Sequence, residues 1–313
     1  MVDNIFGENI LVTGGTGFLG RHVVGELLSL GVTPTVLTRS AQTDVFGKTK
    51  TKPNIVEFDL FDYSGLNVLF EKIRPDRIIH LAGYTHRTDE CPDILGKFNY
   101  EATAKLLEAA ETVKIKRIII IGTADEYGFQ NCPQVETMPA MPVSEYAVSK
   151  NKAVNYALSL HHKENLPVVV ARPFTIYGFN QPAKMFVAQA VECAVRKIPF
   201  AMSNGLQKRD LLFVTDFVNA IIKLLTIEGV EGEVFNVGSG RSIALRDLAK
   251  KIWKIAGADE KLLRIGARQA GQNELHDTHS DNTKIRSWLN WEPQISLDEG
   301  LKLVVGQVTK DLK

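Results

Sequence analysis

Three glycines spaced three residues apart constrain the fold of this chain more than any other feature. Gly14, Gly17 and Gly20 lie between an apolar run at 9–13 and a helical pattern at 20–30. At a junction from strand to helix, such glycines allow a tight turn, approach of the backbone to a pyrophosphate, and close packing of helix on strand. The start of the helix adds N–H groups and a dipole that favour phosphate. The junction therefore predicts a dinucleotide-binding turn.

Short apolar runs typical of buried strands alternate with helical patterns over the first 172 residues. Runs buried on both faces that alternate with helices indicate a parallel sheet with right-handed crossovers. We therefore expect an α/β fold, a doubly wound parallel sheet of the Rossmann type. The expected strands are 9–13, 35–38, 54–58, 77–82, 117–122 and 167–172, and the expected helices are 20–30, 64–73, 97–113 and 145–165.

The pattern is less regular after residue 172. Two more strands are expected at 209–214 and 233–237, and an amphipathic helix at 242–256. We expect a smaller C-terminal lobe that binds the substrate, with returns of the chain to the main sheet. The expected dinucleotide-binding domain is 1–172 plus 207–238, and the expected substrate lobe is 173–206 and 239–313.

Composition excludes several classes of partner. The chain has 37 Lys and Arg against 36 Asp and Glu, a net charge of +1, which gives no basic excess for nucleic acid. No apolar run approaches the roughly 18 residues of a membrane span, and the first strand begins too early for a signal peptide. Three scattered cysteines without metal-ligand spacing are typical of reduced thiols. We expect a cytoplasmic protein with no metal site.

Tyr146 and Lys150 are four residues apart on an expected helix and therefore share one helix face. A neighbouring ammonium stabilises a phenolate and lowers the pKa of a tyrosine from its usual value of about 10. Such a pair is suited to proton transfer while a hydride moves between a nicotinamide dinucleotide and a hydroxyl or ketone. Downstream of the glycine turn, the pair predicts catalysis.

The segment 14–20, GGTGFLG, resembles the signature of the extended short-chain dehydrogenase/reductase superfamily, the NAD-dependent epimerase/dehydratase family, and the resemblance extends over nearly the whole chain. It implies that Thr123, four residues before the tyrosine of a Tyr-Gly pair, hydrogen-bonds the reacting oxygen. It also implies that Asn99 maintains a proton relay near Lys150. The residues expected to contact the cofactor are Gly14, Thr16, Gly17, Phe18, Leu19, Gly20, Arg39, Asp59, Leu60, Leu81, Ala82, Gly83, Asn99, Tyr146, Lys150 and Pro173.

The end of the second strand distinguishes the two nicotinamide dinucleotides. A NAD site usually has an acidic residue there, bonded to the ribose hydroxyls, but this chain has Thr38 followed by Arg39. A guanidinium pairs with a 2′-phosphate, so Arg39 favours NADP(H), with NAD(H) as the alternative. The resemblance implies that Asp59 and Leu60 hold the adenine, although Asp59 is equally suited to cap a helix.

The second half of the chain resembles the substrate side of enzymes that act on nucleotide sugars. Residues 172–178, RPFTIYG, resemble a segment that packs by the nicotinamide, although Thr175 stands where the family often has asparagine. The resemblance implies that Arg209 and Arg268 bind the nucleotide diphosphate, because a planar guanidinium matches phosphate oxygens. Surface ion pairing is the alternative for both. Glu274 stands where the family has an acid, and we assign it no role.

The residues after Thr123 discriminate among the reactions of this superfamily. A 4,6-dehydratase typically has Asp and then Glu directly after that threonine, as acid and base. This chain instead has Ala124, and its acids are displaced to Asp125 and Glu126. Alanine cannot donate a proton, and Arg39 argues against the tightly held NAD of an epimerase. The order T-A-D-E-Y is also similar to S-S-E-E-Y of GDP-4-keto-6-deoxy-mannose reductases.

We therefore expect NADPH-dependent reduction of the C4 ketone of a nucleotide-linked 4-keto-6-deoxy sugar. The expected catalytic residues are Thr123, Tyr146 and Lys150, and the expected substrate contacts are Thr123, Asp125, Thr175, Arg209 and Arg268. The alternatives are a NAD-dependent nucleotide-sugar 4-epimerase, a small-ketone reductase and a non-catalytic dinucleotide sensor. The resemblance also implies a homodimer through a four-helix bundle of the segments near 97–113 and 145–165, unless their apolar faces cover the sheet.

Overall fold

The computed structural model describes residues 5–40, 44–47, 51–85, 92–269, 271 and 274–312, and these form two compact units. The first unit comprises Met1–Glu126, Ala140–Arg172 and Val218–Phe235, and the second comprises Tyr127–Pro139, Pro173–Phe217 and Asn236–Lys313. This division differs from the expected domains in the residues 127–139, 207–217 and 236–238, all of which belong to the second unit.

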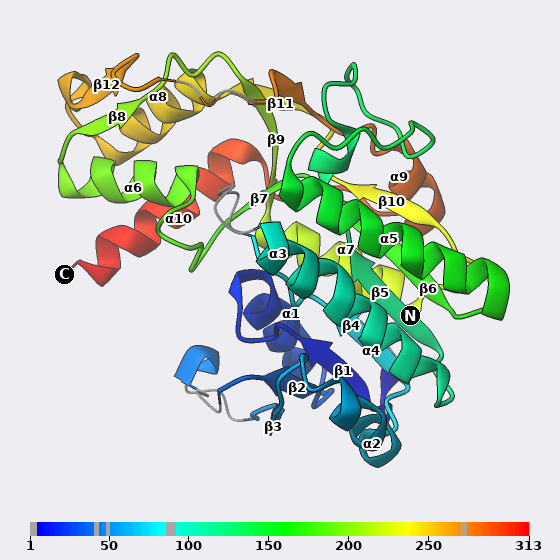
Figure 1. Ribbon diagram of the computed structural model, residues 1–313. Coiled ribbons are helices and arrows are strands. Elements are labelled where there is room, and N and C mark those ends of the chain that lie inside the picture. Colours follow the sequence, from blue (N-terminus) through cyan, green and yellow to red (C-terminus); the bar gives the residue numbers. More distant parts are fainter. Residues whose placement is uncertain are drawn as a thin grey trace. The chain divides into compact units, whose positions relative to one another are not determined.

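A seven-stranded sheet forms the centre of the first unit (Figure 1). Its strand order is β10-β6-β5-β4-β1-β2-β3, and the neighbours from β3 to β6 run parallel. The order 3-2-1-4-5-6 is that of a doubly wound Rossmann sheet, so the predicted fold class is confirmed. The strands are β1 (Ile10–Thr13), β2 (Thr35–Thr38), β3 (Asn54–Glu57), β4 (Arg77–His80), β5 (Arg117–Ile121), β6 (Val168–Pro173) and β10 (Val234–Val237).

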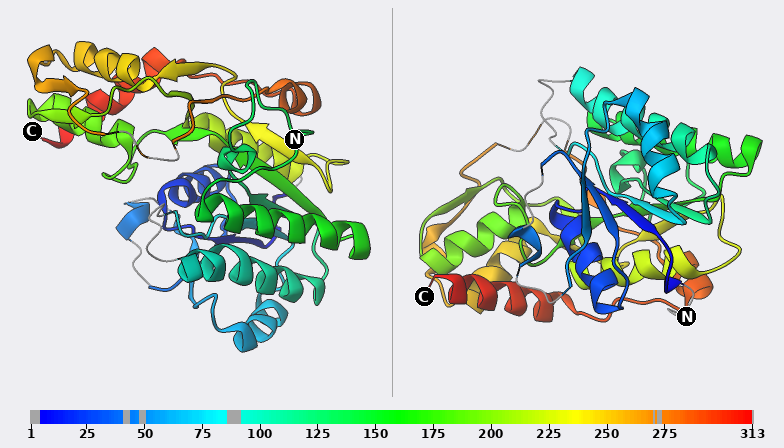
Figure 2. Two further views of the ribbon diagram at one scale, coloured as in Figure 1. Left: turned by 45° about the horizontal axis from the view of Figure 1, so that its top comes forward. Right: turned by 90° about the horizontal axis from the view of Figure 1, so that it is seen from below.

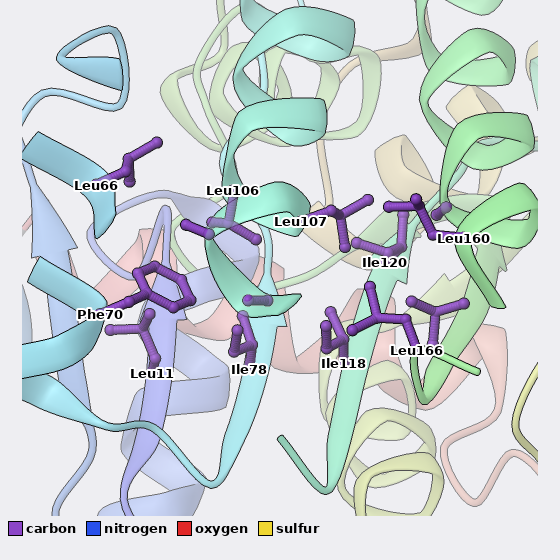
Figure 3. Close-up of a cluster of buried hydrophobic side chains, with 14 of the residues drawn as sticks. Leu11, Leu66, Phe70, Ile78, Leu106, Leu107, Ile118, Ile120, Leu160 and Leu166 are labelled. Carbon is purple, nitrogen blue, oxygen red and sulfur yellow. The ribbon is translucent and has the colours of Figure 1, made fainter. Parts of the chain in front are cut away.

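Helices cover both faces of this sheet (Figure 2). The helices α2 (Tyr63–Ile73), α4 (Ala102–Glu111) and α5 (Glu145–Glu164) pack on one face. Their apolar side chains meet alternate residues of the strands, among them Leu11, Ile78 and Ile118, in a fully buried cluster (Figure 3). The helices α1 (Phe18–Ser29) and α7 (Val214–Thr226) lie on the other face. The inner strands β1 and β5 are buried on both sides, which explains the apolar runs in their sequences, whereas the edge strand β3 is only partly buried.

The apolar helix faces that were predicted to form a dimer interface pack inside the first unit. The side chains concerned are Ala102, Leu106, Leu107, Ala109, Ala153, Tyr156, Ala157 and Leu160, and they are buried or half-buried. Six of them belong to, or pack against, the cluster that covers the sheet. The alternative stated above, that these faces cover the sheet, therefore holds for these side chains.

The second unit contains two smaller sheets. A four-stranded sheet pairs β9 (Lys208–Phe213) with β7 (Thr175–Tyr177), β11 (Ser242–Ala244) and β13 (Asp277–Thr278), and a two-stranded sheet pairs β8 (Phe200–Met202) with β12 (Leu263–Ile265). The helices are α6 (Phe186–Arg196), α8 (Leu245–Ala256), α9 (Thr283–Leu289) and α10 (Leu297–Asp311). Of these, α6, α8 and α10 pack against one another.

Two expectations about this region are wrong. The strand expected at 209–214 does not return to the main sheet, because β9 pairs with β7 and β11 instead. The helix expected at 242–256 begins at Leu245, because Ser242–Ala244 forms strand β11, whose Ser242 lies opposite Asp210 of β9. Among the described residues, no helix has the length and apolar character needed to cross a membrane.

His80, at the end of β4, is fully buried and joins three elements by hydrogen bonds. Its Nδ1 lies 2.7 Å from Thr13 Oγ1, which also accepts the N–H of Ala82 at 3.2 Å. Its Nε2 lies 2.9 Å from Thr103 Oγ1, which donates to Asn99 O at 2.8 Å. Because the Thr103 hydroxyl gives its proton to Asn99, His80 must donate from Nε2 and accept at Nδ1. Burial disfavours the charged ring, and the neutral imidazole satisfies this chain of bonds when Thr13 donates to Nδ1.

Acid should destabilise the protein through this imidazole. Burial, with a smaller effect of the Lys150 charge, lowers the pKa of His80 to about 3. Between about pH 6 and 4 the unfolded chain therefore binds one more proton here than the folded protein. We expect the free energy of unfolding to fall with decreasing pH by about 1.4 kcal/mol per pH unit more in the wild type than in His80→Asn.

Urea denaturation at several pH values measures these slopes. The control is His162→Asn, which alters an exposed imidazole and should leave the wild-type slope unchanged. Equal slopes in the wild type and His80→Asn would contradict the assignment of a neutral, acid-sensitive His80.

Candidate active site

The predicted glycine turn connects β1 to α1 and is closely packed. Gly14 has φ +67°, and a Cβ there would lie 2.6 Å from Ala82 N. A Cβ at Gly20 would overlap Gly14 O, so both positions require glycine. Gly17 differs, because it is exposed and its nearest atom would be Gly14 O at 3.2 Å.

The exposed Gly17 is the N-cap of α1 and has no side chain that could cover the first turn of the helix. The N–H groups at this end of the helix therefore face outward, where a phosphate is favoured. Thr16, Phe18 and Leu19 in the same turn are half-buried. The turn fits a pyrophosphate, because Gly17 leaves the start of the helix uncovered.

Asn99 fixes the loop that follows β4. Its Oδ1 accepts the N–H of Tyr84 at 2.8 Å, and its Nδ2 donates to Tyr84 O and to Ser149 Oγ, both at 3.0 Å. A Cβ placed at Gly83 would lie 3.1 Å from Asn99 Oδ1 and 3.9 Å from Lys150 Nζ. The structure therefore brings Gly83, Asn99 and Lys150 together, as the sequence led us to expect.

The helix expected at 97–113 is not uniform. Residues Gly96–Glu101 form a π-helix, and α4 follows it. Single wide turns of this kind are frequent at functional sites. Asn99 lies in this segment and is completely buried. No sequence signal that we used distinguishes a π-turn from an α-helix, because both share the same apolar spacing over a few residues.

Tyr146 and Lys150 lie in the first two turns of α5. Ser144 caps this helix by accepting the N–H of Ala147 at 3.2 Å. Tyr146 is half-buried, whereas Lys150 is buried. Burial lowers the pKa of Lys150 to about 8, and the negative charge of Glu126 opposes this effect. The ammonium is thus held in a dry environment where its charge acts strongly on its neighbours.

Thr123 lies between the end of β5 and a short 3-10 helix, Ala124–Tyr127, which contains both acids. Thr123 Oγ1 accepts the N–H of Asp125 at 3.3 Å, and Glu126 Oε1 accepts the N–H of Thr123 at 2.7 Å. Ala124 is buried and Asp125 is half-buried. The two acids therefore differ, because Glu126 is fully buried and committed to the backbone while Asp125 keeps some exposure.

The expected adenosine contacts lie at the ends of β2 and β3. Arg39 is exposed, and its guanidinium carbon lies 5.4 Å from the centre of the Phe98 ring. Asp59 is exposed and accepts the N–H of Phe61 at 3.1 Å. It does not cap α2, because Asp62 fills that position by accepting the N–H of Gly65. The helix-cap alternative for Asp59 is thereby excluded.

The expected residues of the substrate side lie in the second unit. Pro173 and Thr175 flank the start of β7, and Thr175 lies opposite Leu211 of β9. Arg209 Nη1 donates to Leu275 O at 2.8 Å, and Glu274 approaches its guanidinium at 3.6 Å. Glu274 also accepts from Gln207 at 2.7 Å, so its described contacts orient this part of β9. Arg268 is exposed.

Asp210 is a buried carboxylate whose importance the sequence analysis missed. It is completely buried and accepts five hydrogen bonds, from the backbone N–H groups of Ser239, Gly240 and Ser280 and from the hydroxyls of both serines. It therefore joins β9 to the turn after β10 and to the segment after β13. The Arg-Asp pair at 209–210 was visible in the sequence, but only its arginine was assigned a role.

Cys132, Asp277 and His279 bring side chains of metal-ligating type together, with ligand atoms within 4.8 Å of one another. The Cys132 thiol donates to Asp277 O at 3.4 Å, and His279 Nδ1 lies 3.2 Å from Asp277 Oδ1. Lys208 Nζ approaches the same carboxylate at 3.9 Å. Burial raises the pKa of the Cys132 thiol, which favours its protonated form. These polar groups are engaged with one another, and the cluster was not predicted because Cys132 is 145 residues away from Asp277 along the chain.

A Rossmann sheet, a glycine turn that fits a pyrophosphate and a buried lysine beside that sheet define a dinucleotide-binding enzyme. The model of the NAD dependent epimerase/dehydratase family matches residues 10–238. The chain belongs to this family and is an enzyme of the extended short-chain dehydrogenase/reductase type. The predicted family and enzyme class are confirmed.

Relatives from bacteria match over almost their whole length. The chain is 28% identical to a UDP-glucuronate 4-epimerase of Thermodesulfobacterium geofontis, over 94% of each chain. It is also 28% identical to a dTDP-glucose 4,6-dehydratase of Haemophilus influenzae, over 95% of this chain and 96% of the relative. Its structure is similar to that of UDP-glucose 4-epimerase from Thermotoga maritima with UDP-glucose, with a TM-score of 0.89, 29% identity, and coverage of 97% and 100%.

Removing the charge of Asp210 should destabilise the second unit. In Asp210→Asn the three N–H groups and two hydroxyls compete for one neutral oxygen, so we expect a loss of about 3 kcal/mol in the free energy of unfolding. Urea denaturation measures the loss. The matched control is Asp298→Asn, because that carboxylate is 59% exposed and pairs with a solvated lysine. A loss at Asp210 no larger than at Asp298 would contradict this role.

Proposed function

We propose that this enzyme is an NADPH-dependent reductase of the C4 ketone of a nucleotide-linked 4-keto-6-deoxy sugar. The observation that carries the proposal is Ala124. Its buried methyl group stands directly after Thr123, where a dehydratase has its acid. Glu126 cannot replace that acid, because its two oxygens are bound to Thr123 N–H and to the Arg172 guanidinium. The position of the dehydratase acid therefore has no proton donor for elimination, whereas the residues needed for ketone reduction are intact.

Thr123, Tyr146 and Lys150 form the proposed catalytic group. Thr123 Oγ1 already accepts the N–H of Asp125, so the proton of its hydroxyl is directed to the substrate oxygen. Tyr146 protonates that oxygen as the alcohol forms. Lys150, buried and charged, stabilises the phenolate that remains on Tyr146 and binds the nicotinamide ribose.

The cofactor would lie along the carboxyl ends of the strands. The turn from Gly14 to Gly20 would hold the pyrophosphate, Asp59 and Leu60 the adenine, and Arg39 a 2′-phosphate. The backbone of residues 81–83, fixed by the glycine turn and by Asn99, would lie beside the nicotinamide ribose. When bound, the reduced nicotinamide supplies the hydride.

The diphosphate of the substrate would be bound by Arg209 and Arg268. Arg209 is oriented by Leu275 O and Glu274, which directs its planar group rather than leaving it to rotate in solvent. Arg268 is exposed and available to an anion. Asp125, half-buried next to Thr123, would accept a hydrogen bond from a neighbouring sugar hydroxyl, and Thr175 would line the same substrate.

A NAD-dependent 4-epimerase is the second candidate, because two of the similar proteins named above are 4-epimerases. An epimerase recycles its cofactor, so it would copurify with NAD and act without added dinucleotide. Absorbance of the dinucleotide released on denaturation distinguishes the two. We further propose a homodimer through a four-helix bundle of the segments near 97–113 and 145–165, which light scattering of the purified protein can test.

The proposed reaction predicts turnover of at least one GDP-, dTDP-, CDP- or UDP-linked 4-keto-6-deoxy sugar with NADPH. Loss of the proton donor in Tyr146→Phe should lower kcat by about 10²- to 10⁴-fold. The matched control is Tyr156→Phe on the same helix, whose hydroxyl bonds Glu108, and it should keep kcat within about twofold. Oxidation of NADPH, followed at 340 nm, measures both. Full activity in Tyr146→Phe would rule out the mechanism.

The proposed cofactor preference predicts a selective loss in Arg39→Ala. Removing the guanidinium should raise the KM for NADPH by about 10- to 100-fold, because a charge-assisted pair contributes about 1.5–3 kcal/mol. The KM for NADH should change little, because NADH has no 2′-phosphate. Initial rates with each cofactor measure the difference, and Lys72→Ala, which removes an exposed cation on α2, is the control. An equal effect on both cofactors would argue against NADPH.

A further inference from the structure

Glu126 is an ionisable side chain that the proposed mechanism does not use directly. Its carboxylate is completely buried at the carboxyl end of β5. One oxygen accepts the N–H of Thr123 at 2.7 Å, and the other accepts Arg172 Nη2 at 2.9 Å. Arg172 lies near the end of β6, and its side chain is 7% exposed. The ion pair therefore joins the ends of two neighbouring strands beneath the proposed catalytic group.

Stability alone does not account for such a pair. Moving two charges out of water costs several kcal/mol each, and well-packed apolar residues of the same volume are often at least as stable. A buried pair at the end of two strands is better explained by what it orients. Here it orients the turn that carries Thr123.

Several hydrogen bonds hold the backbone of the turn formed by residues 123–126. Glu126 N–H donates to Thr123 O at 3.1 Å, Met141 N–H donates to Glu126 O at 2.8 Å, and the Glu126 carboxylate takes the N–H of Thr123. Thr123 Oγ1 in turn accepts from Asp125. The Glu126 side chain is thus the link that ties the position of Thr123 to Arg172 on the next strand.

The charge of Glu126 also acts on Lys150. Among the residues that the structure describes, the charged or titratable groups around this ammonium are Glu126 after β5, His80 on β4, Tyr146 on α5, and Arg172 on β6 through its pair with Glu126. His80 is uncharged at neutral pH, because burial lowers its pKa to about 3. Glu126 is the acidic group that opposes the effect of burial on the pKa of Lys150. Without it, Lys150 would lose its proton at a lower pH.

We propose that Glu126, held by Arg172, is the positioning residue of this site, which fixes the Thr123 hydroxyl and keeps Lys150 charged at neutral pH. This rests on the proposed roles of Thr123, Tyr146 and Lys150 in ketone reduction. Two variants separate the two effects. Glu126→Gln keeps an oxygen for the Thr123 N–H but removes the charge. Glu126→Asp keeps the charge, but its side chain is one methylene shorter, so the carboxylate no longer reaches the Thr123 N–H in the same position.

We expect Glu126→Gln to move the alkaline limb of the kcat–pH profile to lower pH by about half a unit to one unit. The direction follows because reduction requires charged Lys150, which then loses its proton earlier as pH rises. In Glu126→Asp the limb should stay in place while kcat falls by about 10- to 100-fold, because Thr123 is displaced from the reacting oxygen. The KM for the cofactor should stay within about twofold in both variants.

The matched control is Glu231→Gln, which breaks another buried arginine pair of the same unit, Arg117–Glu231. It should lower thermal stability and leave kcat and the pH profile unchanged. The proposal is overturned if Glu126→Gln and Glu126→Asp behave like this control, losing stability while kcat stays within twofold and the limb does not move. Glu126→Asp retains both charges of the pair, so it tests the geometry even if Glu126→Gln does not fold.

A second readout does not depend on the reaction. Titration of the Lys150 ¹⁵Nζ resonance in the cofactor-free protein, assigned with Lys150→Met, should show the same displacement in Glu126→Gln as the kinetic limb. If the wild type reduces no nucleotide sugar, the proposed function fails, but this titration still tests the influence of Glu126. An unchanged Lys150 titration in Glu126→Gln overturns the charge effect in either case.

Discussion

The parallel pairing of β1, β4, β5 and β6 is the constraint on which the proposed site depends. Parallel strands end at the same edge of a sheet, and ligands of such folds bind beyond that edge. Each strand here delivers a different part: the glycine turn follows β1, residues 81–83 follow β4, Thr123 follows β5, and Arg172 ends β6. A shift of one residue in any of these registers would move one part of the site relative to the rest.

The site combines one buried side chain that must stay neutral with two that must stay charged. His80 is neutral because it is fully buried, and Thr13 and Thr103 supply hydrogen-bond partners for its two nitrogens. Glu126 and Lys150 occupy an equally dry environment but have counter-charges or a charged neighbour. Hydrogen-bond direction and charge pairing thus divide the titratable groups of one small region into fixed states. The proposed proton transfer needs such a division, because Tyr146 must give up the proton while Lys150 keeps its own.

The sequence was informative where burial repeats over several residues. The strands of the main sheet contain short apolar runs, so β1 to β6 were predicted to within a residue or two. The glycines were predictable because Gly14 and Gly20 have no room for a Cβ. Strands of two or three residues, such as β11 and β13, are too short to show a hydrophobic pattern in the sequence. Because they pair with β9, that strand belongs to the smaller sheet and not to the main one. Asp210 and Glu126 were seen as acids, but their partners are far apart in sequence, so their burial could not be read from it.

Two arginines of the main sheet have a consequence for how the chain is made. Arg77 of β4 and Arg117 of β5 donate to the carbonyls of Leu225 and Leu224, at sequence separations of 148 and 107 residues. The helix that contains these carbonyls and the edge strand β10 both come late in the chain, yet both contribute to the first unit. During synthesis the growing sheet must therefore wait, with one edge open and with both guanidinium groups still lacking these carbonyl acceptors, until residue 237 has left the ribosome.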